Sequence, residues 1–151
     1  MVRIRNKRIS VPRFDRKEKH YSIEEVLSQT IFDTKRNGKA YKVDFDGEWI
    51  NMASDRYQCF AVYGTTCVDC GLEAQYFIME RQGHYGQYHF NLYGLDDQGN
   101  EVLFTKDHIL PRSRGGKDEL KNYQPMCTNC NNKKGSDLIY PVNTWLIPAY
   151  A

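Results

Sequence analysis

Two cysteine pairs carry the clearest chemistry in this sequence. Cys67 and Cys70 form one C-x-x-C pair, and Cys127 and Cys130 form a second. A disulfide scaffold would need an export signal, and a C-x-x-C redox site needs only one pair in a thioredoxin-like setting. Four thiolates in a reducing cell are instead typical of tetrahedral Zn²⁺. The pattern therefore predicts one structural zinc ion per chain, which closes the loop of 56 residues that separates the two pairs.

A second group of candidate residues lies between and just after these pairs. His108 follows a stretch of alternating apolar residues, so its imidazole can project from a strand and accept a proton from water near pH 7. Hydrolysis of a phosphodiester needs such a base, a cation that stabilises the developing negative charge, and a rigid backbone that holds these groups in place. Asp107 is the preceding residue, so both side chains can serve one phosphate only if the strand twists or ends there. The candidate phosphate contacts are basic residues on the following loop and helix: Arg112, Arg114, Lys117, Lys133 and Lys134.

The order of these motifs from Cys67 to Gly135 resembles the HNH endonucleases, also called the ββα-metal or His-Me finger group, in the version with a four-cysteine zinc site. The resemblance rests on the two cysteine pairs and on Asp107-His108-Ile109-Leu110-Pro111, Gly115-Gly116, Asn122 and Asn131. It implies that His108 is the general base and that Asp107 and Asn131 bind a catalytic Mg²⁺ or Mn²⁺. It also implies that Asn122 ties the loop together through backbone hydrogen bonds, and that Lys134 occupies a common basic position of the family.

Charge is unevenly distributed along the 151 residues, although the net charge is only +2. Residues 1–20 carry +6, residues 43–104 carry −8 and residues 105–135 carry +4. Two basic regions on either side of an acidic middle are typical of a protein whose two ends bind a polyanion. We therefore treat residues 1–20 as a basic arm that is extended or flexible until a partner orders it, with a merely solvated tail as the alternative.

The remaining elements follow from local signals. Ser22 is a candidate N-cap for a helix that runs to about Thr34, and Asp46-Gly47 predicts a hairpin. Ser54 and Gly64 bound a second helix. Residues 74–80 and 87–93 are strand-like, and residues 88–93 and 101–105 predict an antiparallel hairpin. If that hairpin pairs Leu95 with Asn100, His89 shares a face with His108, although a structural or supporting role for His89 is favoured.

These signals predict an α+β fold in which the four-cysteine zinc site holds a ββα-metal finger together. An antiparallel hairpin is inserted in it, and a small α/β extension precedes it. The expected domains are a basic arm (1–20), a helix–hairpin–helix extension (21–63), a zinc-stapled core (64–136) and an apolar segment that packs on that core (137–151). Cys59 lies outside both pairs and is expected to be a buried small hydrophobe.

The expected activity is divalent-metal-dependent hydrolysis of double-stranded DNA. Each active site is expected to nick one strand. A zinc module that binds nucleic acid without catalysis and a nuclease that acts on RNA are the alternatives. The sequence has no apolar run of the roughly 20 residues that span a bilayer and no apolar leader, so no membrane partner is expected. We expect a cytoplasmic protein in a bacterial or phage-infected host cell, as a monomer or homodimer. The short HNH proteins of phages and mobile elements are the members of the family that it resembles in kind.

Overall fold

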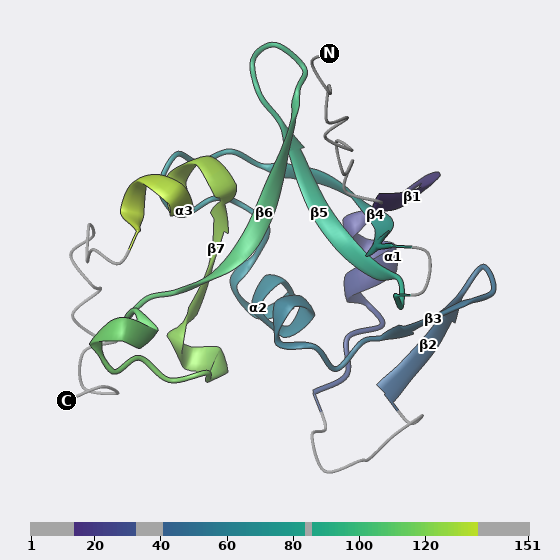
Figure 1. Cartoon of the computed structure of the whole chain (residues 1–151), viewed down its shortest axis with the longest axis horizontal. Helices are drawn as coiled ribbons and strands as arrows, with labels where there is room; N and C mark the ends of the chain where they lie inside the picture. The colour runs from purple at the N-terminus through teal and green to yellow at the C-terminus, as the bar shows by residue number, and fades with distance from the viewer. Residues whose placement is uncertain (1–13, 33–40, 84–85, 136–151) are drawn as a thin grey trace, which may run out of the picture.

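The computed structural model describes residues 14–32, 41–83 and 86–135. Its main element is a five-stranded antiparallel sheet in the order β1-β4-β5-β6-β7 (Figure 1). The strands are β1 (Phe14–Tyr21), β4 (Ala74–Gln82), β5 (His89–Leu95), β6 (Glu101–His108) and β7 (Tyr123–Cys127). The mixed α+β class is confirmed. The described residues hold no helix with the length and apolarity that a bilayer crossing requires.

Strand β1 corrects the prediction of a free basic arm over residues 1–20. Phe14–Tyr21 pairs with β4, so this part is ordered by the protein's own sheet, whereas residues 1–13 lie outside the described residues. Two of its basic side chains pair with carboxylates elsewhere in the fold: Arg16 binds Glu101 on β6 at 2.6 Å, and Lys19 binds Asp46 in the Asp46-Gly47 turn at 2.8 Å. These cations are therefore already paired within the protein.

Between β1 and β4, the described residues form two helices and a hairpin. Helix α1 (Ile23–Leu27) begins at Ser22, whose hydroxyl accepts a hydrogen bond from the Glu25 amide. It ends seven residues before the predicted Thr34, and the Ile31 amide donates instead to the Met52 carbonyl. Strands β2 (Lys42–Phe45) and β3 (Glu48–Asn51) form the predicted hairpin, with positive φ at both Asp46 and Gly47 as its tight turn requires.

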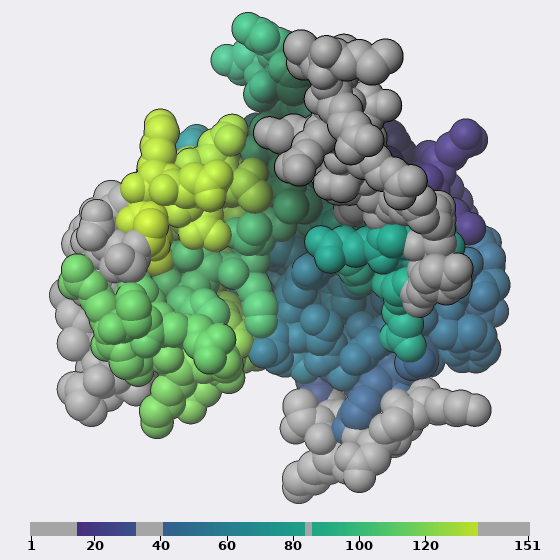
Figure 2. Space-filling model, viewed as in Figure 1, coloured from purple at the N-terminus to yellow at the C-terminus, as the bar shows by residue number. Residues whose placement is uncertain are grey.

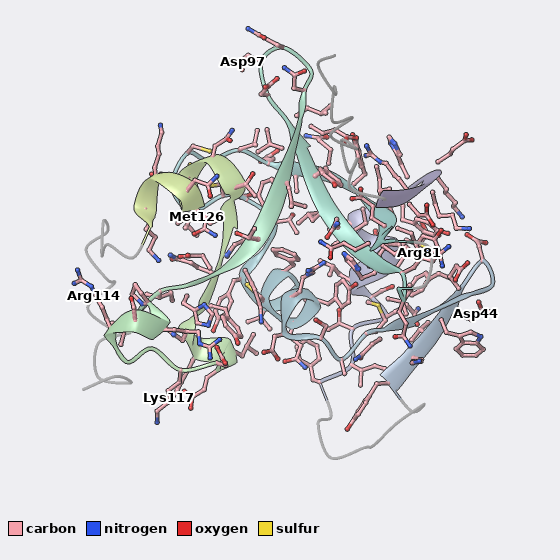
Figure 3. The ribbon with its side chains drawn as sticks, in the orientation of Figure 1. Asp44, Arg81, Asp97, Arg114, Lys117 and Met126 are labelled. Atoms are coloured by element: carbon pink, nitrogen blue, oxygen red, sulfur yellow. The ribbon has the colours of Figure 1, made fainter. Side chains whose placement is uncertain are left out.

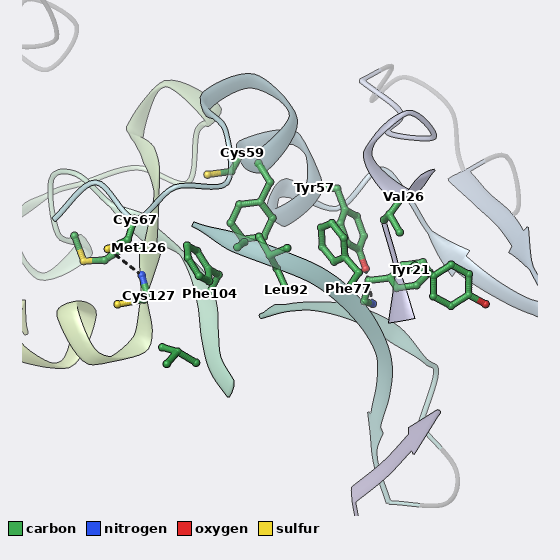
Figure 4. Close-up of a cluster of buried hydrophobic side chains, with 14 of the residues drawn as sticks. Tyr21, Val26, Tyr57, Cys59, Cys67, Phe77, Leu92, Phe104, Met126 and Cys127 are labelled. Atoms are coloured by element: carbon green, nitrogen blue, oxygen red, sulfur yellow. Dashed lines mark hydrogen bonds between the residues drawn. The ribbon is translucent and has the colours of Figure 1, made fainter. Parts of the chain in front are cut away.

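Helix α2 (Asp55–Tyr63) lies between Ser54 and Gly64 as predicted and covers one face of the sheet. It packs against β6 and β7, so the expected N-terminal extension and the expected core share one hydrophobic core. Figure 4 shows this continuity, from Tyr21 and Val26 through Tyr57 and Phe77 to Phe104 and Cys67. Cys59 is fully buried in this core, as expected. Phe77 of β4 and Phe90 of β5 also pack here, with 5.9 Å between their ring centres.

The C-terminal part of the described chain consists of two antiparallel strands followed by a helix. β6 and β7 pair along Phe104–His108, and helix α3 (Thr128–Lys134) packs back on β6. Two short 3₁₀ turns, η2 (Arg112–Arg114) and η3 (Leu120–Asn122), lie in the connection between the strands. The predicted apolar segment 137–151 lies outside the described residues.

Candidate functional site

A pocket of about 280 Å³ lies where β6 ends beside α3. Asp107, His108 and Asn131 all line it, although Asp107 and His108 are neighbours in the chain. Both reach one pocket because His108 is the last residue of β6. The remaining lining residues come from the end of the strand, the loop and the helix: Lys106, Pro111, Arg112, Lys134 and Gly135.

His108 has two ordered neighbours. Its Nε2 atom lies 2.7 Å from an Oδ1 atom of Asp118, a residue that the sequence analysis did not single out. The Tyr123 ring contacts the His108 ring edge-on, with 5.1 Å between the ring centres. A carboxylate can only accept a hydrogen bond, so the imidazole donates through Nε2. The hydrogen bond from His108 lowers the pKa of Asp118, which keeps this carboxylate ionised.

Asp107 is buried and bonded to two other side chains. Lys134 donates to its Oδ2 atom at 2.6 Å and Gln124 donates to the same atom at 2.9 Å. Lys134 also donates to the His108 carbonyl at 2.6 Å, and its side chain is only 2% exposed. This corrects the assignment of Lys134 as a surface phosphate contact, because the last turn of α3 faces β6 and carries the ammonium group inward.

The oxygen ligands that a hard divalent cation needs are present in this pocket. Lys134 and Gln124 both bind Oδ2 of Asp107, so Oδ1 is the carboxylate oxygen that can take a cation. Asn131 donates through its Nδ2 atom to Thr105 at 3.0 Å, which orients its carbonyl oxygen as a neutral donor. One carboxylate and one amide oxygen are suitable for Mg²⁺ or Mn²⁺, which retain several water ligands. The residues therefore fit the predicted ion.

Asn122 holds the loop after His108 in place. It is completely buried, its Oδ1 accepts from the Leu110 amide, and its Nδ2 donates to the carbonyls of Leu110 and Lys117. These backbone hydrogen bonds are the ones the family resemblance implied for this residue. Gly116 allows the loop to close, because a Cβ atom there would lie 1.7 Å from the Leu110 carbonyl oxygen.

A further cluster lies behind the histidine and was not predicted. Tyr123 donates its hydroxyl to Asp55 at 2.9 Å, and the Lys106 ammonium lies over the Tyr123 ring at 4.4 Å. Burial, followed by the hydrogen bond to Asp55, raises the pKa of Tyr123. Asp55 is the first residue of α2, so the N-terminal half of the chain supports the ring against which His108 packs. A contact between residues so far apart in sequence leaves no local signal.

The four predicted zinc cysteines form one cluster. The sulfur atoms of Cys67, Cys70, Cys127 and Cys130 lie within 4.8 Å of one another, close to the roughly 3.8 Å that tetrahedral Zn–S bonds of about 2.3 Å require. Burial opposes ionisation of Cys67, but backbone N–H groups, with that of Cys127 foremost, lower its pKa to about 7. Burial and the neighbouring thiols raise the pKa of Cys130, a cost that a bound cation would remove. The donor set therefore fits structural zinc.

The remaining basic candidates lie on the surface of the protein. Arg112, Arg114, Lys117 and Lys133 are exposed, and Figure 3 shows Arg114 and Lys117 projecting from the connection between β6 and β7. In Figure 2 this connection and α3 occupy the same side of the molecule, as green and yellow surfaces. The exposed cations therefore lie on the connection and on α3, the two elements that contribute residues to the pocket beside the end of β6.

His89 lies outside this pocket. The hairpin pairs Leu95 with Glu101, not with Asn100 as assumed, and a shift of one residue places a side chain on the opposite face of its strand. The premise that placed His89 on the face of His108 is therefore wrong. Burial and the charge of Arg56 lower the pKa of His89, and its strand neighbour is Glu80.

Comparison with known proteins bears directly on this part of the chain. Residues 96–142 match a family model described as HNH endonuclease. The matched segment contains β6, β7 and α3, and with them Asp107, His108, Asn122 and Asn131. The resemblance inferred from the motifs is thereby confirmed, and it points to nuclease activity. No curated protein and no solved structure was found to match the chain.

Proposed function

We propose that the HNH endonuclease motif in residues 96–142 makes this protein a metal-dependent nuclease that cuts DNA, with His108 as the general base. The observation that carries the proposal is the single pocket that Asp107, His108 and Asn131 share. It combines a proton acceptor with two oxygen donors for a cation. β6, β7 and α3 would then be the ββα-metal finger, and the cysteine cluster would hold zinc for structure alone.

In the proposed reaction, His108 takes a proton from a water molecule as the water oxygen forms a bond to phosphorus. The bond from phosphorus to the 3′ oxygen breaks, and that oxygen takes a proton from solvent, so the products carry a 5′-phosphate and a 3′-hydroxyl. Asp107 and Asn131 would hold a Mg²⁺ or Mn²⁺ ion that stabilises negative charge on the phosphate. Asn122 keeps the loop closed, which fixes His108 relative to the phosphate.

DNA is the proposed substrate because the loop and the helix that contribute to the pocket carry exposed cations. Arg112 lines the pocket itself, Arg114 and Lys117 are exposed on the same loop, and Lys133 is exposed on α3. Lysine and arginine side chains that contact phosphates position a duplex without reading its sequence. One pocket can cut one strand, so the expected product from a monomer is a nick, and a double-strand break requires a second site.

Cleavage of supercoiled plasmid tests the proposal. We expect nicking by the wild-type protein with Mg²⁺ or Mn²⁺, and a loss of at least about 100-fold on His108→Ala or on addition of a chelator. His20→Ala is the matched control, because His20 lies on β1 at the opposite edge of the sheet and stacks on Tyr76. Nicking that persists undiminished in His108→Ala would contradict the assignment of the base.

A panel of substrates separates the alternatives. Duplex DNA, single-stranded DNA and RNA of the same sequence are incubated with the protein under the same metal conditions. Preferred cleavage of DNA supports the proposal, and cleavage restricted to RNA would replace it with a ribonuclease. Tight binding of DNA with no cleavage of any substrate would instead identify a zinc module that binds nucleic acid.

A further inference from the structure

The imidazole of the candidate base contacts a carboxylate that is not among the expected HNH motif residues. Asp118 lies ten residues after His108, and its Oδ1 atom is 2.7 Å from the imidazole Nε2. Asp118 also lies 3.7 Å from the Nε of Arg112, one of the residues that line the pocket. The Asp118 side chain is 52% exposed, so the contact has to be distinguished from an incidental surface ion pair.

The backbone on both sides of Asp118 is fixed. The carbonyl of Lys117 accepts a hydrogen bond from the Asn122 side chain at 2.9 Å, and the carbonyl of Glu119 accepts one from the Asn122 amide at 2.8 Å. The buried Asn122 therefore clamps the residues before and after Asp118. An exposed ion pair is weak in part because two mobile side chains must be held together. Here the chain around the carboxylate is held already.

The imidazole is fixed from two directions. Tyr123 meets it edge-on, with an angle of 75° between the rings, and Asp118 binds its Nε2 atom. A neutral imidazole carries one N–H, and a carboxylate can accept but not donate. When the N–H lies on Nε2 and points to Asp118, the lone pair lies on Nδ1. The protonated nitrogen of a histidine is set in this way by the hydrogen bond that it makes.

We propose that Asp118 is a positioning residue for His108, which holds the imidazole as the Nε2–H tautomer and leaves Nδ1 as the atom that takes the proton from water. The inference rests on the proposed function, because it assigns a proton-accepting atom to the proposed base. Asp118 touches neither substrate nor ion in this role. It acts through the orientation and tautomer of His108, as carboxylates behind catalytic or metal-bound histidines do.

The first test measures the tautomer directly and needs neither DNA nor metal. ¹⁵N NMR of the imidazole ring at about pH 8.5, two units above the ordinary histidine value of about 6.5, distinguishes a protonated Nε2 from a protonated Nδ1. The His108 signals are assigned by comparison with His108→Ala. We expect the Nε2–H form in the wild type. In Asp118→Asn the amide can donate to Nε2, so the Nδ1–H form should gain population. A wild-type ring protonated on Nδ1 would overturn the proposal.

The second test measures turnover. Asp118→Asn and Asp118→Ala should lower kcat for plasmid nicking by about 10- to 100-fold with KM changed by less than about twofold. Glu119→Gln is the control, because it removes a negative charge from the same loop and its side chain pairs with Lys121 at 3.5 Å. If Asp118 acted only by repelling the DNA phosphates, Asp118→Ala and Glu119→Gln would lower KM by the same factor and leave kcat unchanged. That result would contradict the positioning role.

The two tests separate this inference from the proposed function. If no substrate is cut and the NMR spectra show the expected tautomer, the nuclease proposal fails while the contact stands. If the wild-type protein cuts DNA and Asp118→Ala cuts it equally fast, the positioning role fails while the nuclease stands. Because Asp118 is half exposed, both substitutions should leave the fold intact, which thermal unfolding checks.

Discussion

The side chain of Asn122 and the backbone of Leu110 form a two-way hydrogen-bonded pair, in which Oδ1 accepts from the Leu110 amide and Nδ2 donates to the Leu110 carbonyl. The pair joins the end of β6 to the beginning of β7. Because the same Nδ2 also binds the Lys117 carbonyl, a single buried amide closes the loop that carries Arg112, Arg114 and Asp118.

Asn122→Ala should therefore destabilise the whole protein as well as slow cleavage. It removes three hydrogen bonds to the backbone and leaves buried polar atoms without their partners, which should lower the free energy of unfolding by about 2–4 kcal/mol. Urea denaturation measures this change. Asn132→Ala, at an exposed position on α3, should change the free energy by less than about 0.5 kcal/mol. Equal effects of the two substitutions would show that the clamp is unimportant.

Zinc content tests the cysteine cluster. We expect about one zinc ion per chain by elemental analysis, with loss of zinc and of cooperative unfolding in Cys67→Ser. Cys59→Ala is the matched control, because Cys59 is a buried cysteine outside the cluster and its loss should leave the zinc content unchanged. A folded protein without zinc would contradict the structural role of the site.

Lys134 provides a prediction about the buried ion pair with Asp107. Lys134→Met leaves the Asp107 carboxylate buried without its cation, which should cost about 3–5 kcal/mol of stability. If Asp107 also binds a divalent ion, Mg²⁺ should raise the melting temperature of Lys134→Met more than that of the wild type, because the ion then supplies the missing charge. Lys133→Met, at the exposed neighbouring position, should match the wild type in both measurements. An identical Mg²⁺ response in all three proteins would count against a metal at Asp107.

The sequence predicted the features that depend on short-range patterns or on complete motifs. The turn at Asp46-Gly47 and the helix between Ser54 and Gly64 follow from local backbone preferences, and the cysteine cluster follows from ligand spacing. β1 was missed because its pairing partner β4 begins more than fifty residues later, and the charges that resemble a free arm are neutralised only across strands. Asp118 and Lys134 were missed or misplaced for a similar reason, since only the folded loop and helix show which way each side chain points.

Glu101 predicts a dependence of stability on pH. Burial alone would raise its pKa, but hydrogen bonds from Tyr76 and Arg16 lower it below the usual value of 4.5. A carboxylate with a lowered pKa in the folded state stabilises the protein above that usual value, and the contribution is lost as pH falls through the lowered pKa. Glu101→Gln should remove roughly 0.5–1 kcal/mol at pH 7, with a difference from the wild type that shrinks below about pH 4. Urea denaturation from pH 7 to pH 3 measures it, and a difference that grows on acidification would contradict the assignment.

Two truncations distinguish the basic residues that precede the sheet from those within it. Residues 1–13 carry five cations and no carboxylate, whereas Arg16 and Lys19 on β1 are paired with Glu101 and Asp46. If the first group binds DNA, deletion of residues 2–13 should weaken binding and make the slope of log affinity against log salt shallower by about 0.9 for each phosphate that is no longer neutralised. Deletion through Lys19 also removes most of β1, so it should lower the melting temperature in addition. Binding titrations over a range of salt concentrations measure the slope, and an unchanged slope for the shorter deletion would assign DNA binding to the cations around the pocket alone.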